Sequence, residues 1–319
     1  MKGLKSKLRL VINLKNIIEV SGLKKSYGDV EAVKGIDFQV EEGQLFAFLG
    51  PNGAGKSTTV EMLCTLLASN GGKVLIDGFE LGKKDEEIRK RIGVVFQNNS
   101  LDALLKVKEN IRIRGSFYGL KGAELDKAYK FAAESTGITE FENRQYHKLS
   151  GGQKRRADIA RALMHSPKIL FLDEPTTGLD PQTRKSIWET IREMQKKTNM
   201  TVFLTTHYME EAAKADYVVV IDGGKITASG TPTQLRDEYA KDLMYLTAKP
   251  ESEQKICEYL NNNNYEYRSE GGRLIVTLKS TVSSLPVLKE FGDEFVNFEV
   301  VAGTMDDAFI AITGGGLKK

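Results

Sequence analysis

The sequence predicts an α/β fold in which a parallel sheet carries a glycine-rich loop, helices are inserted, and a small α+β domain follows. Three observations predict this architecture. Apolar strand-length segments alternate with helical patterns, which is typical of a parallel sheet covered on both faces. Residues 103–166 have a mostly helical pattern and look like an insertion. After Tyr239 the patterns follow the order strand, helix, strand, strand, helix, strand of a ferredoxin-like domain.

The individual elements follow from apolar periodicity and turn residues. Residues 16–46 alternate in the strand manner and lead into the loop "GPNGAGKST". The next segment, "STTVEMLCTLLAS", has the regular apolar stripe of a helix. Further strands are predicted at "GGKVLIDG", "RIGVVFQ", "ILFLD", "TVFLTTH" and "YVVVIDGGKI", with helices at "TRKSIWETIREMQKK" and "MEEAAKA".

These patterns divide the chain into three parts. Residues 1–15 are expected to be an N-terminal extension, and residues 16–239 the main domain, with a helical subdomain at about 103–166 and an antiparallel β subdomain. Residues 240–319 are expected to be a ferredoxin-like accessory domain that ends in a tail helix at "TMDDAFIAIT".

Composition limits the classes of protein that fit. The 46 basic and 43 acidic residues give a net charge of +3, too small an excess for a dedicated nucleic-acid binder. Cys64 and Cys257 lie far apart, so reduced thiols are expected rather than a disulfide framework. No apolar run approaches the roughly eighteen residues of a membrane helix, and the basic N-terminus lacks the features of a signal peptide. We therefore expect a cytoplasmic protein that could still dock on a membrane protein.

The segment Gly50–Ser57 matches the phosphate-loop pattern G-x-x-x-x-G-K-[ST] in full, between a predicted strand and a predicted helix. Its glycines let backbone N–H groups approach phosphate oxygens at a helix N-terminus. Lys56 would reach the β- and γ-phosphates, and the Ser57 hydroxyl would bind Mg²⁺. A plain glycine turn is the alternative, but the complete match in this context predicts a nucleotide site. Its residues are Gly50, Pro51, Asn52, Gly53, Ala54, Gly55, Lys56, Ser57 and Thr58.

Two carboxylates, Asp173 and Glu174, end the apolar strand "ILFLD". The carboxyl ends of strands in open α/β sheets are where ligands bind. Asp173 would hold Mg²⁺, and Glu174 would act as general base towards the attacking water. The alternative is a solvated acidic turn before Pro175, which is less favoured beside a complete phosphate loop.

Gln97 and His207 each follow a predicted strand and should therefore reach the same edge of the sheet. His207 would contact the γ-phosphate, whereas the Gln97 amide oxygen would bind Mg²⁺ or the attacking water. Alone, each residue could equally be an ordinary surface or core residue.

A second glycine turn opens the segment "LSGGQKRRADIARAL". Ser150 and Gln153 have the S-x-x-Q spacing of a helix capping box. Capping does not explain Gly151 and Gly152, each of which costs roughly 1 kcal/mol relative to alanine in a helix. Free backbone amides beside a serine at a helix N-terminus suggest a second anion site.

Together, these motifs resemble the ATP-binding cassette (ABC) family over residues 16–238. The matching positions are Gly50–Thr58, Gln97, 149–153, 169–174, "GLD" at 178–180 and His207. In that family two cassettes pair head to tail, so the resemblance implies that the second glycine turn serves the partner's ATP. It further implies that Tyr27 stacks on adenine and that Mg²⁺ is bound by Ser57, Gln97 and Asp173. The catalytic residues it implies are Glu174, His207, Gln97 and Lys56. Across the dimer, it implies that Asp180 bridges the subunits and that the residues acting in trans are Ser150, Gly151, Gly152 and Gln153.

The resemblance implies an ATPase subunit that works as a homodimer, or with a related subunit, on the cytoplasmic face of the membrane. "GTMDDAFIAITG" and "VVFQNNSLDALLKVKENIRIRGSFYGL" resemble the daunorubicin-resistance type, which serves exporters with a separate ABC-2 permease. Alternatives are an importer ATPase, a soluble ABC protein of translation or DNA repair, and a regulatory module without turnover. The last is opposed by Glu174 and His207.

In the resembling family, a groove beside the segment after the glutamine receives a helix from the membrane subunit. Here this surface would include parts of residues 98–118. The candidate apolar contacts are Leu101, Leu104, Leu105, Phe117 and Tyr118. The alternative is that these side chains form the core of the helical subdomain.

Overall fold

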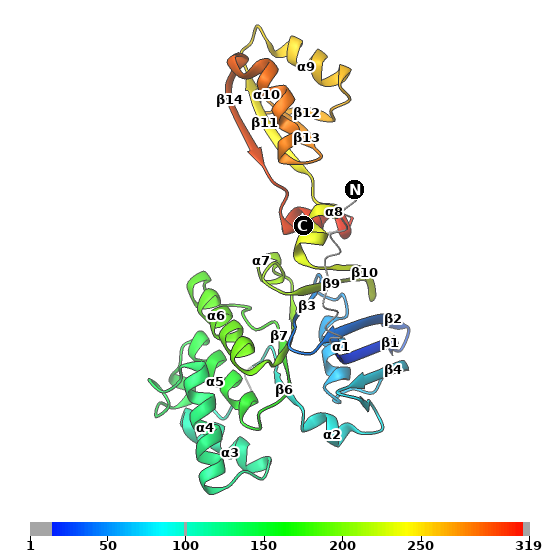
Figure 1. Ribbon diagram of the computed structural model, residues 1–319. Helices are drawn as coiled ribbons and strands as arrows, with labels where there is room; N and C mark the ends of the chain where they lie inside the picture. Colours follow the sequence, from blue (N-terminus) through cyan, green and yellow to red (C-terminus); the bar gives the residue numbers. More distant parts are fainter. Residues whose placement is uncertain (1–14, 99–100, 315–319) are drawn as a thin grey trace, which may run out of the picture.

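The computed structural model describes residues 15–98 and 101–314, which form three sheets surrounded by helices (Figure 1). Apart from Lys15, the expected N-terminal extension lies outside the described residues. Within the described ranges, no helix is both long enough and apolar enough to cross a membrane.

The central sheet has six strands in the order β10-β9-β3-β8-β7-β6. The four strands β9, β8, β7 and β6 run parallel to β3 and to one another, and β10 is antiparallel to β9. Leu45 and Leu49 of β3 belong to one core, whereas Phe46 and Phe48 belong to another on the opposite face. The sheet is thus buried on both faces, as predicted. Its strands are β3 (Leu45–Leu49), β6 (Ile92–Val95), β7 (Ile169–Asp173), β8 (Thr201–Thr206), β9 (Tyr217–Asp222) and β10 (Lys225–Gly230).

An antiparallel sheet in the order β2-β1-β4-β5 covers one face of the central sheet. Between the two sheets, Phe38 packs against Phe46, Phe48 and Phe203. Helix α1 ends at Leu63, earlier than its apolar stripe predicts, because the chain turns at Thr65 with φ +62°. These elements are β1 (Asn16–Tyr27), β2 (Val30–Glu41), α1 (Lys56–Leu63), β4 (Gly71–Ile76), β5 (Phe79–Glu80) and α2 (Asp85–Arg89).

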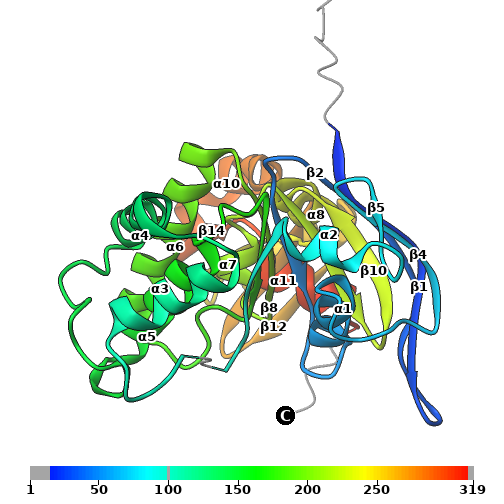
Figure 2. The same cartoon turned by 90° about the horizontal axis from the view of Figure 1, so that it is seen from below.

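Helices cover the other face of the central sheet. In Figure 2 helices α3 to α6 gather on one side of the molecule, and strands β1, β2 and β4 lie on the other. The α/β architecture expected from the sequence, with its helical insertion and antiparallel sheet, is thus observed. The helices are α3 (Val107–Phe117), α4 (Gly122–Thr136), η1 (Tyr146–Lys148), α5 (Gly151–Leu163), α6 (Pro181–Thr198), α7 (Met209–Ala212) and α8 (Pro232–Tyr239).

The third sheet is antiparallel, in the order β12-β13-β11-β14. It has its own core, to which α9 contributes Ile256 and Leu260, and α10 contributes Val287 and Phe291. The order of elements is that of the predicted ferredoxin-like domain. They are β11 (Asp242–Ala248), α9 (Glu253–Asn262), β12 (Tyr267–Glu270), β13 (Arg273–Leu278), η2 (Thr281–Ser284), α10 (Leu285–Phe291), η3 (Gly292–Glu294) and β14 (Phe295–Val301).

The last helix, α11 (Met305–Ile312), differs in position from the expected accessory-domain tail. Met305 and Phe309 belong to the same core as Leu235 of α8, and α11 also contacts α7. Residues 240–319 therefore include a helix that packs on the main domain. Burial of its apolar side chains there explains the return of the chain after β14.

Candidate active site

The phosphate loop joins the buried strand β3 to α1. Gly55 has φ +104°, and a Cβ there would lie 2.5 Å from the carbonyl oxygen of Ala32. A Cβ on Gly50 would lie 2.3 Å from the carbonyl oxygen of Ile221. Only glycine fits both positions without a shift of backbone. No side chain caps α1, so its first N–H groups are available to an anion.

A cavity of about 470 Å³ lies in front of this loop. It brings together residues that are far apart in the sequence, including Lys56, Gln97 and His207. The cavity is large enough for a small-molecule ligand. Of the predicted site residues, its lining includes Asn52, Gly53, Gly55, Lys56, Ser57, Thr58, Gln97, Glu174 and His207.

Lys56 is only 4% exposed, and its ammonium group has three neighbours. It donates hydrogen bonds to the carbonyl oxygens of Gly50 (2.8 Å) and Pro51 (3.1 Å). Its Nζ lies 3.4 Å from Oε1 of Glu174. Burial lowers the pKa of Lys56, and the charges of Glu174 and Asp173 oppose that shift.

Glu174 adopts φ +44°, a left-handed conformation that is uncommon outside glycine. Its Oε2 accepts a hydrogen bond from Thr177 (3.0 Å) and lies 3.3 Å from Nδ1 of His207. Burial alone would raise the pKa of this carboxyl, but Lys56 and His207 outweigh burial and hold the pKa below its usual value. Glu174 is therefore ionised at neutral pH.

Asp173 lies behind the cavity and is connected to it by hydroxyl groups. Ser57 donates a hydrogen bond to Oδ1 of Asp173 (3.3 Å), and Thr205 donates to the same oxygen (2.5 Å). Thr205 Oγ1 also accepts from the backbone N–H of Glu174 (3.0 Å). Thr205 was not predicted. Its only signal in the sequence is the hydroxyl pair at the end of "TVFLTTH".

The donor set fits Mg²⁺ bound together with phosphates. Ser57, Gln97 and Asp173 offer a hydroxyl, an amide and a carboxylate oxygen, which are hard ligands. Among residues 15–98 and 101–314, no group of three or more His, Cys, Asp or Glu side chains could hold a metal by itself. Mg²⁺ with a nucleotide needs only one or two carboxylates, because phosphates and waters complete its shell.

The second glycine turn is built as a capping box. Ser150 Oγ accepts from the N–H of Gln153 (3.3 Å), and Oε1 of Gln153 accepts from the N–H of Ser150 (3.1 Å). Ser150 and Gly151 are exposed, and none of residues 150–153 lines the cavity. A Cβ on Gly152 would lie 2.3 Å from Cγ2 of Thr183. Close packing against α6 thus accounts for Gly152, a reason that the sequence did not reveal.

Two further predicted residues also lie outside the cavity lining. Asp180 is exposed and caps α6, since its Oδ1 accepts from the N–H of Thr183 (3.0 Å). Tyr27 is 49% exposed at the end of β1, with the Lys25 ammonium 5.4 Å from its ring centroid. An exposed aromatic of this kind is free to stack on a flat ligand.

Arg155 was missed by the sequence interpretation. Its side chain is buried and donates hydrogen bonds to four backbone carbonyls, those of Phe96, Asp173, Glu174 and Pro175. It therefore joins α5 to the strand end before Gln97 and to the backbone of Glu174. Because an arginine is usually solvated, nothing in the spacing marked this one as buried.

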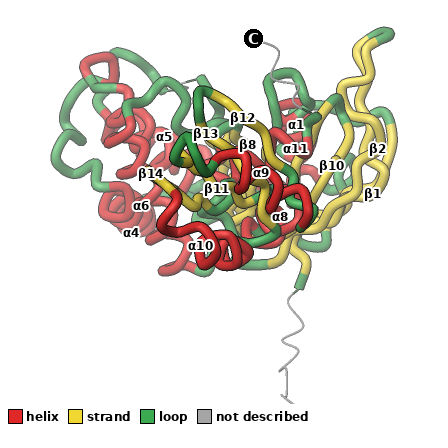
Figure 3. The backbone as a smooth tube through the Cα atoms, turned by 90° about the horizontal axis from the view of Figure 1, so that it is seen from above, coloured by secondary structure: helices red, strands yellow, loops and turns green. Residues whose placement is uncertain are grey.

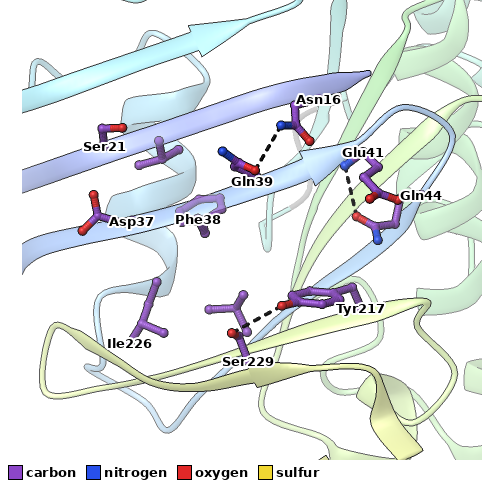
Figure 4. A pocket seen from close by; sticks show the side chains of 12 residues that line it. Asn16, Ser21, Asp37, Phe38, Gln39, Glu41, Gln44, Tyr217, Ile226 and Ser229 are labelled. Atoms are coloured by element: carbon purple, nitrogen blue, oxygen red, sulfur yellow. Dashed lines mark hydrogen bonds between the residues drawn. The ribbon is translucent and has the colours of Figure 1, made fainter. Parts of the chain in front are cut away.

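A cleft of about 450 Å³ between β1–β2 and β9–β10 contains none of the predicted residues (Figure 4). Its polar groups bond to one another: Asn16 to Gln39 (3.0 Å) and Tyr217 to Ser229 (3.4 Å). These side chains are thus satisfied within the protein.

A groove of about 320 Å³ lies beside α3 and includes Phe117 and Tyr118. Phe117 is 75% exposed, whereas Tyr118 is half-buried and stacks on His165. Leu104 is 73% exposed but does not line the groove. Leu101 packs against a core and Leu105 is half-buried. Residues 99 and 100 of the predicted surface lie outside the described residues.

Comparison with known families and proteins gives a consistent picture. The family model described as "ABC transporter" matches residues 33–177. The daunorubicin/doxorubicin resistance ATP-binding protein of Streptomyces peucetius is 34% identical over 306 residues, 93% of this chain and 92% of that protein. The linearmycin resistance ATP-binding protein of Bacillus subtilis is 41% identical over 220 residues, 69% of this chain and 70% of that protein.

Solved structures of similar fold include a part of an ABC transporter complex and an ATP-binding cassette. The structure of cbiO1 from Clostridium perfringens has a TM-score of 0.65 and 31% identity, and the alignment covers 77% of this chain and 95% of that one. The dimeric post-hydrolysis structure of the ATP-binding cassette MJ0796 with ADP and Pi has a TM-score of 0.61 and 28% identity. That alignment covers 67% of this chain and 98% of MJ0796.

Proposed function

Since the chain belongs to the ATP-binding subunits of ABC transporters, an ATPase family, we propose that it drives export by a separate membrane protein. The observation that carries this proposal is the single cavity in which Lys56, Glu174 and His207 face a complete phosphate loop. Export follows from the relative that spans 93% of the chain and is named for drug resistance. Import, or a soluble function outside transport, has no such support.

ATP phosphates bind at the loop residues 50–58, and Lys56 turns from Glu174 towards the β- and γ-phosphates. This movement has a chemical consequence for Glu174. In the ion pair with Lys56, 3.4 Å apart, the pKa of Glu174 is depressed, which makes it a weak proton acceptor. Once Lys56 contacts phosphate, Glu174 regains basicity and accepts the proton of the attacking water. His207 keeps its place beside Glu174 and donates towards the γ-phosphate.

Mg²⁺ would be held by Ser57, Gln97 and Asp173. When bound, it would neutralise negative charge on the phosphate oxygens. Ser57 would contribute its hydroxyl oxygen, and Thr205, which donates a hydrogen bond to Oδ1 of Asp173, orients that carboxylate. Gln97, which is exposed at the cavity edge, completes the set through its amide oxygen.

ABC ATPases function as dimers with a membrane permease, and we assign the second glycine turn to the ATP of the other subunit in a homodimer. Ser150, Gly151, Gly152 and Gln153 lie outside the chain's own cavity, which supports a role in trans. Asp180 is exposed beside them and bridges the two subunits. Tyr27 stacks on the adenine ring.

The membrane partner is an ABC-2 permease, and the chain lies peripherally on the cytoplasmic face. The groove beside α3 suits a partner helix because it combines the exposed Phe117 with the basic residues Arg89 and Arg114. No carboxylate is among its lining residues. A helix with apolar and acidic side chains would complement this surface.

The test is the hydrolysis rate of the Glu174→Gln variant with ATP and Mg²⁺. Turnover should fall about 100-fold or more, since the amide keeps the shape but cannot accept a proton. ATP binding, measured by equilibrium dialysis, should persist because Lys56 and the loop are unchanged. Glu210→Gln, an exposed carboxylate on α7, is the matched control. A wild-type rate for Glu174→Gln would remove Glu174 from the mechanism.

A further inference from the structure

The third sheet has one face that no described helix covers. Its other face packs on α9 and α10, through strand residues such as Met244 and Val276. Side chains alternate between faces along a strand, so Tyr245 and Ile275 project from the opposite face. Ile275 is only 6% exposed, yet it is not part of the core beneath α9 and α10.

The central row of the uncovered face runs across all four strands. Arg268 pairs with Ile275, Ile275 with Tyr245, and Tyr245 with Glu299. The row is therefore basic at one end, apolar in the middle and acidic at the other end. The next row contains Thr277, Leu243 and Val301, and at its end Glu266 lies beside Thr277 and is paired with Lys241 (3.1 Å).

The charged ends cannot neutralise each other within one chain. Three strand spacings separate Arg268 from Glu299, about 14 Å across the sheet. Both side chains are exposed. Arg268 Nε donates a hydrogen bond to Oε2 of Glu270 (3.5 Å), an exposed ion pair of the kind that contributes little, and no ion pair of Glu299 is found in the described part of the chain.

A second copy would pair these charges. Rotation by 180° about an axis parallel to the strands turns one sheet face onto the other and reverses the order of strands. Arg268 of one copy then lies above Glu299 of the other, twice, and Tyr245 lies above Ile275. Stacked sheets lie about 10 Å apart, a gap that these side chains can span. Such a contact is isologous, as a two-fold dimer requires.

We propose that the uncovered face of the third sheet is a self-association surface that binds the same face of a second copy. Figures 2 and 3 show α10 on the side of the molecule away from α1.

The size of the face determines how the contact acts. Four strands of about six residues give about 400 Å² per copy, less than the roughly 800 Å² per partner of a stable interface. The contact is therefore weak alone and strengthens a dimer that other surfaces also hold together. In this respect it rests on the proposed ATP-dependent dimer.

Charge reversal tests the pairing in the full chain. In the Glu174→Gln background with ATP and Mg²⁺, Arg268→Glu and Glu299→Arg should each raise the dimer dissociation constant about tenfold, measured by sedimentation. The two reversals combined should restore it to within about twofold of the parent, because the pairs form again with opposite sign. Lys289→Glu and Glu290→Arg, exposed on the helix side, are controls expected to change little. Equal effects of the single and combined reversals would overturn the proposal.

Cross-linking gives an answer even if ATP induces no dimer. In a Cys257→Ser background, a tagged Arg268→Cys chain is mixed with an untagged Glu299→Cys chain and treated with a bismaleimide of about 10 Å, with and without ATP. Mixed dimers should form selectively, since two copies of position 268 would be about 17 Å apart. No selective mixed product in either condition rejects the sheet contact. Monomers with ATP in sedimentation would instead reject the proposed ATP-dependent dimer.

Discussion

The two glycine turns of this chain both precede a helix, yet their surroundings differ. The loop before α1 has no side-chain cap and opens onto a cavity where Lys56 and Glu174 form a buried ion pair. The turn before α5 is exposed, and its capping box satisfies the N–H groups of Ser150 and Gln153 but not those of the two glycines between them. The first turn thus faces charged side chains of its own chain across a cavity, whereas the second turn does not line that cavity.

This difference teaches that a glycine motif must be judged by what each glycine approaches. Gly50 and Gly55 pass backbone carbonyls so closely that a side chain cannot fit. Gly152 instead passes the side chain of Thr183, which belongs to the next helix of the same domain. The second turn therefore needs glycine partly for packing, whatever it does for a nucleotide.

Ser150→Asp should separate capping from the proposed role in trans, and it has the largest expected effect. Aspartate caps helices as well as serine does, so the melting temperature should change little. Its negative charge would face the phosphates of the partner's ATP. Turnover should fall about 100-fold, the scale seen when one donor to a developing charge is lost.

The matched control is Ser150→Thr, which keeps the hydroxyl and the cap and should retain most of the activity. If the Ser150→Asp protein is folded and hydrolyses ATP at the wild-type rate, the second turn does not face a nucleotide. The glycines of the second turn would then be explained by helix packing alone, and only the first turn would bind a nucleotide.

Gly152→Ala addresses packing and has a smaller expected effect. The added Cβ meets Cγ2 of Thr183 at 2.3 Å, so the free energy of unfolding should drop by about 1–3 kcal/mol. Turnover should fall several-fold as α5 shifts. Thr183→Ser removes Cγ2, and the combined variant should recover both stability and turnover.

Denaturant unfolding and ATPase assays on the four proteins of this cycle provide the measurement. Recovery of stability without recovery of turnover would contradict the packing account. Gly152 would then be needed by the nucleotide of the partner.

The sequence predicted those parts of the fold that periodicity controls. The strands β3, β7 and β8 are buried at every residue; β3 is apolar throughout, β7 is apolar up to Asp173, and β8 has the apolar centre Val202–Leu204. The position of α11 could not be predicted in this way. Its apolar stripe shows that one face is buried, but not that the burial is against α7 and α8. Such a choice depends on long-range packing, which a local pattern does not contain.

The site shows the same division. The phosphate-loop pattern predicted Lys56, and strand ends together with the family resemblance predicted Glu174 and His207; all three line one cavity. Arg155 and Thr205 were not predicted, because they act on backbone groups that only the folded chain brings near. The packing role of Gly152 was not predicted either, because its neighbour Thr183 lies on another helix and only the folded chain brings the two together.

Phe117→Glu should leave the turnover of the isolated protein within about twofold, the smallest effect on hydrolysis, because the side chain lies outside both glycine turns. It is 75% exposed, so the charge should cost little stability. Co-purification with the membrane subunit should nevertheless be lost, since a carboxylate in the docking groove would repel an acidic partner helix and replace the apolar contact. Ile113→Glu is the control, because Ile113 is an exposed residue of α3 that does not line the groove. If the folded Phe117→Glu protein still co-purifies with the membrane subunit, docking takes place elsewhere. The groove beside α3 then has no part in coupling the nucleotide site to the membrane protein.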